Sequence, residues 1–126
     1  MTLPEEGYLL RIFIGESDKH ASLPLYEWIV LEARRQGLAG ATVTRGMMGF
    51  GANSRVIHTF KIERLSEDLP ILVEIVDTRE KLEEFLASME DKIQAGLATL
   101  EKVQVRLYRS SRPTHPTESG LFQPEK

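Results

Sequence analysis

The 126-residue sequence contains no cysteine. This absence excludes disulfide bonds, thiolate metal sites and cysteine nucleophiles, and it fits a reducing compartment. No apolar run approaches the roughly 20 residues that a membrane-spanning helix needs, and the acidic first residues differ from a signal peptide. The sequence therefore predicts a cytoplasmic protein.

The chain also lacks a strong excess of charge of either sign. Sixteen Lys and Arg residues against nineteen Asp and Glu residues leave a formal charge of -3, so the overall field gives no reason to expect attraction to nucleic acid. The composition, 41% hydrophobic and 28% charged, is that of a folded globular protein. The length predicts one domain with one core.

The first half of the chain reads as a strand followed by a helix. A nearly all-apolar run at residues 8–15 predicts a buried central strand. Ser22 is a candidate cap for a helix that Pro24 helps to start and that Gly37 ends. This helix is expected to cover one face of a sheet.

Two extended segments follow, at residues 41–48 and 56–65, and the glycine-bearing turn between them predicts a projecting hairpin. Residues 71–76 predict a third core strand. Asp77 and Glu80, three residues apart, are typical of a helix start.

Apolar residues then recur at helical spacing from Leu82 to Ile93, which predicts an amphipathic helix that ends at Gly96. Alternating residues at 103–108 predict the last strand. The order βαββαβ is that of an α+β, ferredoxin-like split βαβ fold with both helices on one face of an antiparallel sheet. The bare face needs a partner, and a closed trimer would bury it.

The chain divides into a folded domain at residues 1–109 and a tail at 110–126. The tail contains Pro113, Pro116 and Pro124 among Ser, Thr and Glu. This composition predicts a flexible segment.

Four segments carry a resemblance to a known family: LLRIFIGESD at 9–18, GATVTRGMMGFG at 40–51, SRVIHT at 54–59 and LSEDLP at 65–70. On these segments the chain resembles the PII signalling superfamily, and specifically its PII-like branch of unknown function. The resemblance implies a ferredoxin-like homotrimer that binds adenine nucleotides in clefts between subunits. It also implies a membrane transporter or a metabolic enzyme as the regulated partner.

The sequence departs from true PII proteins in two places. Their phosphate site is closed by a Gly-Asp-Gly-Lys type of turn, whereas the corresponding residues 96–102 keep only Lys102 and Gly96. This loss favours AMP or ADP over ATP as the ligand. No tyrosine lies between Gly51 and Leu69, so control by uridylylation is not expected.

The glycine-rich turn holds the main candidates for nucleotide binding. Gly49 and Gly51 could present backbone amides to phosphate oxygens, and Phe50 could contact the adenine or seal the cleft. The alternative is a hairpin bend with a buried phenylalanine. Gly46 belongs to the same candidate set. The neighbouring Met47 and Met48 are expected to pack in the core or the hairpin.

Charged and polar residues complete the candidate site. Arg45 could neutralise a phosphate, and Lys102 is a phosphate candidate carried over from the PII resemblance. His58 could hydrogen-bond a ribose or a base. Glu16, with Ser17 and Asp18, follows a buried strand and could bind a ligand or cap the first helix.

Further residues on the last strand could contribute to a neighbouring subunit. Glu74 lies between apolar residues of a core strand and is expected to pair with an arginine such as Arg106 across a subunit interface. Arg106 and Arg109 could reach a phosphate in a neighbouring cleft.

These observations favour a sensor over an enzyme, with no cofactor and no catalytic residue assigned. An adenine nucleotide would order residues 52–68 and thereby change a surface for a partner. The alternative is a CutA-like metal-tolerance protein or a small enzyme on the same scaffold. For an enzyme, the available acid and base groups are Asp18, His20 and His58, whose spacing specifies no reaction.

Overall fold

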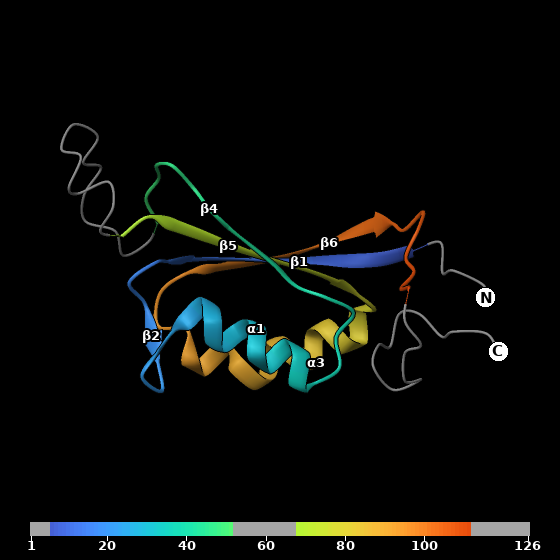
Figure 1. Cartoon of the computed structure of the whole chain (residues 1–126), viewed down its shortest axis with the longest axis horizontal. Coiled ribbons are helices and arrows are strands. Elements are labelled where there is room, and N and C mark those ends of the chain that lie inside the picture. The colour runs from blue at the N-terminus through green and yellow to red at the C-terminus, as the bar shows by residue number, and fades with distance from the viewer. Residues whose placement is uncertain (1–5, 52–67, 112–126) are drawn as a thin grey trace.

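The computed structural model describes residues 6–51 and 68–111. Two helices, α1 (Leu25–Arg35) and α3 (Arg79–Met89), cover one face of a four-stranded sheet, and neither packs on the other face (Figure 1). No helix in these two ranges combines the length and the apolar character that crossing a bilayer requires.

The sheet contains β1 (Glu6–Gly15), β4 (Thr42–Arg45), β5 (Pro70–Asp77) and β6 (Leu97–Gln104). Their order is β4-β5-β1-β6, and every neighbouring pair is antiparallel. This is the strand order of a ferredoxin-like split βαβ. The predicted α+β fold is therefore confirmed, while the expected strand at 56–65 lies outside the described residues.

The core lies between the sheet and the two helices. Strand β1 is almost entirely apolar, but its side chains alternate between the two faces of the sheet. Leu10, Ile12 and Ile14 are buried under the helices, while Phe13 remains 38% exposed on the other face. Each helix contributes three buried side chains at helical spacing: Leu25, Ile29, Ala33, Leu82, Phe85 and Met89.

The start of α1 differs from the prediction. A small hairpin of β2 (Lys19–His20) and β3 (Leu23–Pro24) precedes the helix, and Ser22 lies in its turn with a φ of 68°. The N-cap residue is Pro24, which makes no side-chain capping hydrogen bond. The prediction that Ser22 caps this helix is therefore wrong, because the hairpin turn takes that residue.

The start of α3 is displaced by one residue from the prediction. Thr78 is the N-cap, and its hydroxyl accepts a hydrogen bond from the Lys81 amide at 3.2 Å. Asp77 is instead fully buried, and its carboxylate accepts hydrogen bonds from the amides of Thr78 at 2.7 Å and Ala39 at 2.9 Å. It thereby ties the end of β5 to the connection between α1 and β4.

Helix α3 is followed by the short helix η1 (Glu90–Lys92), so it ends earlier than the predicted stop at Gly96. Gly96 instead lies against β1, where an added Cβ would stand 2.7 Å from the Phe13 carbonyl oxygen. The glycine permits a close approach of two strands.

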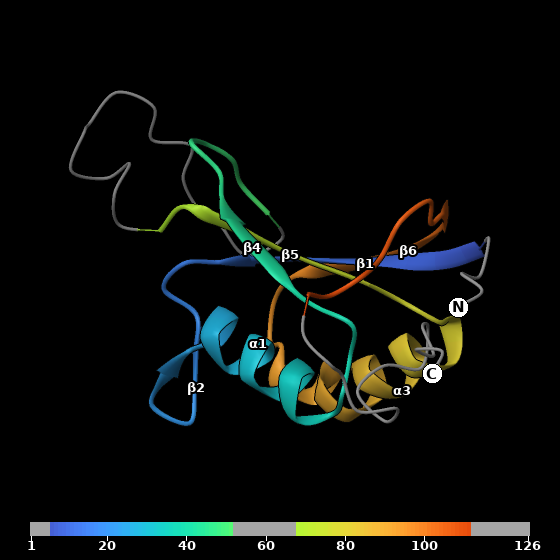
Figure 2. The same ribbon diagram turned by 45° about the vertical axis from the view of Figure 1, so that its right-hand side comes forward.

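The last strand also begins earlier than predicted. Residues 97–102, predicted as the counterpart of a phosphate-binding turn, form most of β6, and the predicted strand at 103–108 is mostly beyond its end. After β6 the chain doubles back across the sheet (Figure 2). The Tyr108 hydroxyl then donates to the Ala39 carbonyl at 2.9 Å.

Strand β4 is shorter than the predicted segment 41–48, because it ends at Arg45. Met47 and Met48 follow it with exposed fractions of 89% and 57%. The prediction that these methionines pack in the core is therefore wrong, and their packing in the hairpin stays a prediction, because the expected second strand of that hairpin lies outside the described residues.

Candidate functional site

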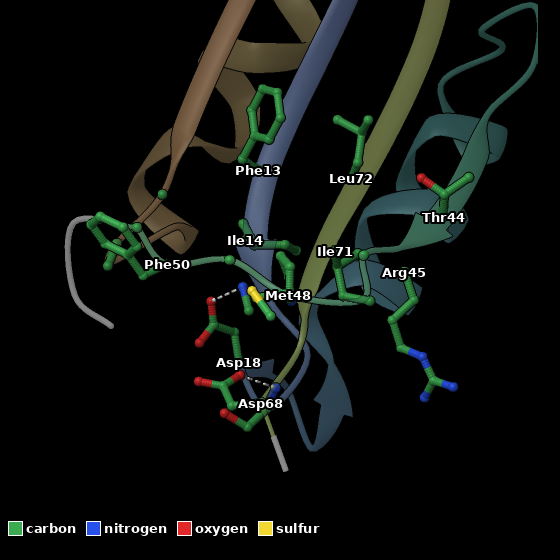
Figure 3. A pocket seen from close by; sticks show the side chains of 18 residues that line it. Phe13, Ile14, Asp18, Thr44, Arg45, Met48, Phe50, Asp68, Ile71 and Leu72 are labelled. Atoms are coloured by element: carbon green, nitrogen blue, oxygen red, sulfur yellow. Dashed lines mark hydrogen bonds between the residues drawn. The ribbon is translucent and has the colours of Figure 1, made fainter. Parts of the chain in front are cut away.

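A pocket of about 690 Å³ lies at one end of the sheet. Its lining comes from the end of β1, the start of β5 and the segment 46–51 that follows β4 (Figure 3). The residues just before β6 complete its wall. Gly46, Gly49, Gly51 and Phe50, which were predicted to belong to one site, all line this pocket.

Hydrogen bonds shape the turn that follows β1. The Glu16 amide donates to the Leu69 carbonyl at 2.9 Å, which fastens the turn to the start of β5. The Gly15 amide donates to the Asp18 carboxylate at 3.0 Å, and the Ser17 amide donates to the Asp68 carboxylate at 3.1 Å. Asp18 thus closes this turn and does not cap α1 with its side chain.

The segment after β4 contains glycines of two kinds. Gly46 is structural, because its amide donates to the Pro70 carbonyl at 2.7 Å and an added Cβ would stand 2.8 Å from Pro70 Cγ. At Gly51 an added Cβ would meet no atom within 4 Å. Packing among the described residues therefore explains the glycine at position 46 but not the one at position 51.

The amides at positions 49–51 have no hydrogen-bond partner within residues 6–51 and 68–111. Backbone amides that are free and close together can bind an anion, since each carries a partial positive charge. Among the described residues the predicted phosphate-binding amides thus have no competing partner, whereas the amide of Gly46 is bound to Pro70 at the start of β5.

Apolar side chains form another part of the pocket. Phe13, Met48 and Phe50 line it and remain 38%, 57% and 66% exposed. The alternative of a buried phenylalanine in the bend is therefore wrong for Phe50. Exposed aromatic rings in a concave site suit a flat ligand ring.

Arg45 and Glu16 form an ion pair, with Nη1 and Oε2 2.9 Å apart. The other carboxylate oxygen of Glu16, Oε1, is buried and has no hydrogen-bond partner among the described residues. A phosphate that binds Arg45 would have to compete with Glu16. In Figure 3 the Arg45 side chain projects on the opposite side of β5 from Asp18 and Asp68.

Lys102 does not reach this pocket within one chain. It pairs with Tyr8 near the opposite end of β1, and its Nζ atom lies 3.8 Å from a carboxylate oxygen of Glu6. His58, the other predicted ligand contact, lies outside the described residues.

Within one chain Glu74 binds Arg11, while its expected pairing with Arg106 across a subunit interface stays a prediction. Arg11 donates from Nε to Glu74 at 3.0 Å and from Nη1 to Glu101 at 2.8 Å. The hydrogen bond to Glu74 raises the pKa of Arg11 above its ordinary value, with a further contribution from the charge of Glu101. Sequence analysis missed Arg11, although a single arginine inside an apolar strand was a usable signal.

Comparison with known proteins shows the family of this chain. Residues 7–105 match the family model DUF190, described as Uncharacterized ACR, COG1993. The chain belongs to this family. A UPF0166 protein of Aquifex aeolicus is 40% identical over 97 residues, which cover 77% of this chain and 90% of the relative. A UPF0166 protein of Methanocaldococcus jannaschii is 35% identical over 86 residues, covering 68% and 78%.

Solved structures of PII-like proteins share the fold. CPII of Thiomonas intermedia, bound to ADP and bicarbonate, superposes with a TM-score of 0.58 at 17% identity, covering 79% of this chain and 88% of CPII. A putative PII-like signaling protein of Thermus thermophilus gives 0.54 at 24% identity, covering 79% and 89%. The predicted PII-like fold is therefore confirmed for this DUF190 chain.

Proposed function

We propose that this DUF190 protein is a PII-like regulator that binds an adenine nucleotide in the pocket at the end of the sheet. The observation that carries the proposal is the set of amides at 49–51, unpartnered among the described residues, beside exposed aromatic rings in one pocket. The amides suit a phosphate and the rings suit a base. Its structural neighbour CPII was solved with ADP, and also with ADP and AMP together.

The charges around the pocket favour AMP or ADP over ATP. Asp18 and Asp68 line the pocket, and the guanidinium of Arg45 is already paired with Glu16. A triphosphate would bring more negative charge than the described residues of one chain can offset.

The active assembly in this proposal is a homotrimer. The open face of the sheet carries exposed apolar side chains, including Phe13 and Leu97, which a symmetric assembly would bury. A trimer would also let Lys102 and Arg106 of one subunit approach a cleft of its neighbour.

The protein would act by occupancy and not by catalysis. Nucleotide binding next to position 51 would change the conformation of residues 52–68, which follow directly in the chain. That segment would then present or withhold a surface for a transporter or a metabolic enzyme in the cytoplasm.

Calorimetric titration tests the proposal. The purified protein is titrated with AMP, ADP, ATP and cyclic AMP, each with and without magnesium, and with GTP as the control. We expect saturable binding of AMP or ADP near one site per chain. Gly51→Ala should weaken binding without loss of stability, whereas Gly40→Ala, which also has open space at its Cβ but lies outside the pocket, should leave binding unchanged. No binding of any nucleotide would refute the proposal.

The metal-tolerance alternative has a separate test. In the parts of the chain that the structure describes, no three His, Cys, Asp or Glu side chains come together as a metal site. A copper or zinc titration that reached micromolar affinity at one site per trimer would nevertheless favour this alternative. For the enzyme alternative, His58→Ala should abolish turnover, whereas in the sensor it should only weaken binding.

A further inference from the structure

Two carboxylates lie next to each other in the wall of the pocket, those of Asp18 and Asp68 (Figure 3). Gly15 shows how close they come. An added Cβ on Gly15 would stand 2.7 Å from Asp68 Oδ1 and 3.4 Å from Asp18 Oδ1. Both oxygens therefore converge above the same bare Cα, and any larger residue at position 15 would disturb at least Asp68.

Backbone amides hold both carboxylates in place. Asp18 accepts from Gly15 through Oδ2, and Asp68 accepts from Ser17 through Oδ1. Within the described ranges, Asp18 Oδ1 and Asp68 Oδ2 have no hydrogen-bond partner, and neither residue forms an ion pair with a lysine or an arginine. Each side chain thus combines a fixed position with unused acceptor capacity.

Such a pair repels anions and attracts hydrogen-bond donors. Arg45 does not compensate the pair, since it lies on the other side of β5 and binds Glu16. The amides at 49–51, which have no partner among the described residues, come from the segment after β4, whereas the two aspartates come from the turn after β1 and from the residues just before β5. A phosphate would be repelled by the aspartates and attracted by those amides, so a nucleotide whose phosphate binds the amides would present its uncharged part to the aspartates.

The apolar side chains of the pocket are a separate indication that the uncharged part of the ligand contains a ring. Phe13, Leu72 and Phe50 line the same pocket, and two of these residues are aromatic side chains exposed to it. A ring placed against them would carry its attached hydroxyl or amino groups within the same pocket as the aspartates.

We propose that Asp18 and Asp68 select the nucleoside half of the ligand, by accepting hydrogen bonds from its neutral donors. These donors are the ribose hydroxyls or the exocyclic amine of adenine. The inference rests on the proposed function, and it adds the residues that recognise the sugar or the base.

The test is a calorimetric titration of the full chain with four ligands: AMP, 2′-deoxy-AMP, 3′-deoxy-AMP and IMP. Each is measured on the wild type, on Asp18→Asn and on Asp68→Asn. Asparagine keeps a side-chain oxygen for the amide of Gly15 or Ser17, so the turn is preserved. Asp91→Asn is the control, because Asp91 is exposed on η1 and does not line the pocket.

We expect the wild type to bind AMP about tenfold or more tightly than the analogue that lacks the recognised donor, as is typical of hydrogen bonds to charged groups. The deoxy analogues and IMP distinguish a sugar donor from a base donor. Asp68→Asn and Asp18→Asn should weaken AMP binding and reduce the preference, and Asp91→Asn should change neither.

Whether the asparagine variants bind AMP more weakly or more tightly than the wild type decides whether the aspartates recognise the ligand. If the aspartates only repel phosphate, their substitution by asparagine will strengthen AMP binding, and the inference is wrong. Equal affinity of the wild type for all four ligands would overturn it as well, while leaving the proposed function intact. Absence of binding for every nucleotide would overturn both.

Discussion

At the scale of single residues, Asp77 connects three parts of the chain. It is fully buried at the end of β5, and it accepts hydrogen bonds from the amide that follows it and from Ala39. The Ala39 carbonyl in turn accepts from Tyr108. The Asp77 carboxylate and the backbone of Ala39 thereby join β5, the connection before β4 and the segment after β6.

We expect Asp77→Ala to lower the free energy of unfolding by about 2–3 kcal/mol, because it leaves the Ala39 amide without its partner. Urea denaturation measures the change. Asp91→Ala, which removes an exposed carboxylate from η1, should change stability by less than about 0.5 kcal/mol. Equal effects of the two substitutions would contradict the role of Asp77 as a junction.

The ion pair on α1 predicts a small dependence of stability on pH. Hydrogen bonds from Arg35 to Glu32 lower the pKa of that carboxyl group below its ordinary value of 4.5. A lowered pKa in the folded state means that the stabilisation is present above the unfolded pKa and is lost as the pH falls through the folded pKa. The pair is partly exposed, so its contribution is well under about 1 kcal/mol.

Glu32→Gln should therefore destabilise the protein slightly at neutral pH, and the difference from the wild type should vanish as the pH falls through the lowered pKa of Glu32 in the folded state. Denaturation midpoints across this range measure it. A difference that grows on acidification would have the wrong sign for a lowered pKa.

The candidate site was predictable where its residues are close in sequence. The glycines at 49 and 51, with Phe50 between them, were identified from one short motif together with the resemblance to PII-like proteins. Asp68 was not identified as a site residue, because it lies 51 residues from Ser17 in the sequence. The two come together only because β1 and β5 pair in the sheet. The Arg45–Glu16 ion pair was missed for the same reason, since side-chain pairing follows the register of the sheet.

At the scale of elements, the contact between β6 and β1 depends on Gly96. A side chain at this position would press on the backbone of β1, because the nearest atom is the carbonyl oxygen of Phe13 at 2.7 Å. We expect Gly96→Ala to destabilise the fold by about 1–3 kcal/mol, as is usual for overpacking.

Gly40→Ala is the matched control, since an added Cβ there meets nothing within 4 Å. Thermal denaturation should show no loss for Gly40→Ala, or a gain of up to about 1 kcal/mol from a less flexible unfolded chain. A similar loss for both variants would mean that the backbone conformation of glycine, and not the approach of the strands, is responsible.

Elements with a strong hydrophobic pattern were predicted well, and edge elements were not. The central strands β1 and β5 and the two helices each bury one full face, and their periodicity reveals them. Strand β6 has exposed residues on both faces of most of its length, so no alternation marks its start. Its true beginning is fixed by hydrogen bonds to β1, which a local pattern does not contain.

At the scale of the whole molecule, the open face of the sheet carries exposed apolar side chains that call for an explanation. Leu97 and Phe13 pair across β6 and β1 and are 58% and 38% exposed. The Arg11 cluster with Glu74 and Glu101 lies on the same face, further along the strands.

If this face forms the proposed trimer, Leu97→Asp should yield monomers in analytical ultracentrifugation, because it places a charge in the interface. Far-ultraviolet circular dichroism should remain that of the wild type. Leu31→Asp is the control, since Leu31 is 50% exposed on α1, away from the sheet face, and should leave the assembly unchanged. Dissociation by both variants would argue against the open face.

The sheet order also has a consequence for the synthesis of the protein. Strand β1 lies between β5 and β6, so the strand of this sheet that is synthesised first pairs with the two that are synthesised last. Arg11 and Glu101, which pair across β1 and β6, are 90 residues apart. At roughly 5–20 residues per second this interval lasts about 5 to 20 s. During it the apolar strand β1 lacks β6, and for the first 63 of these residues it lacks β5 as well, which gives a chaperone time to bind it.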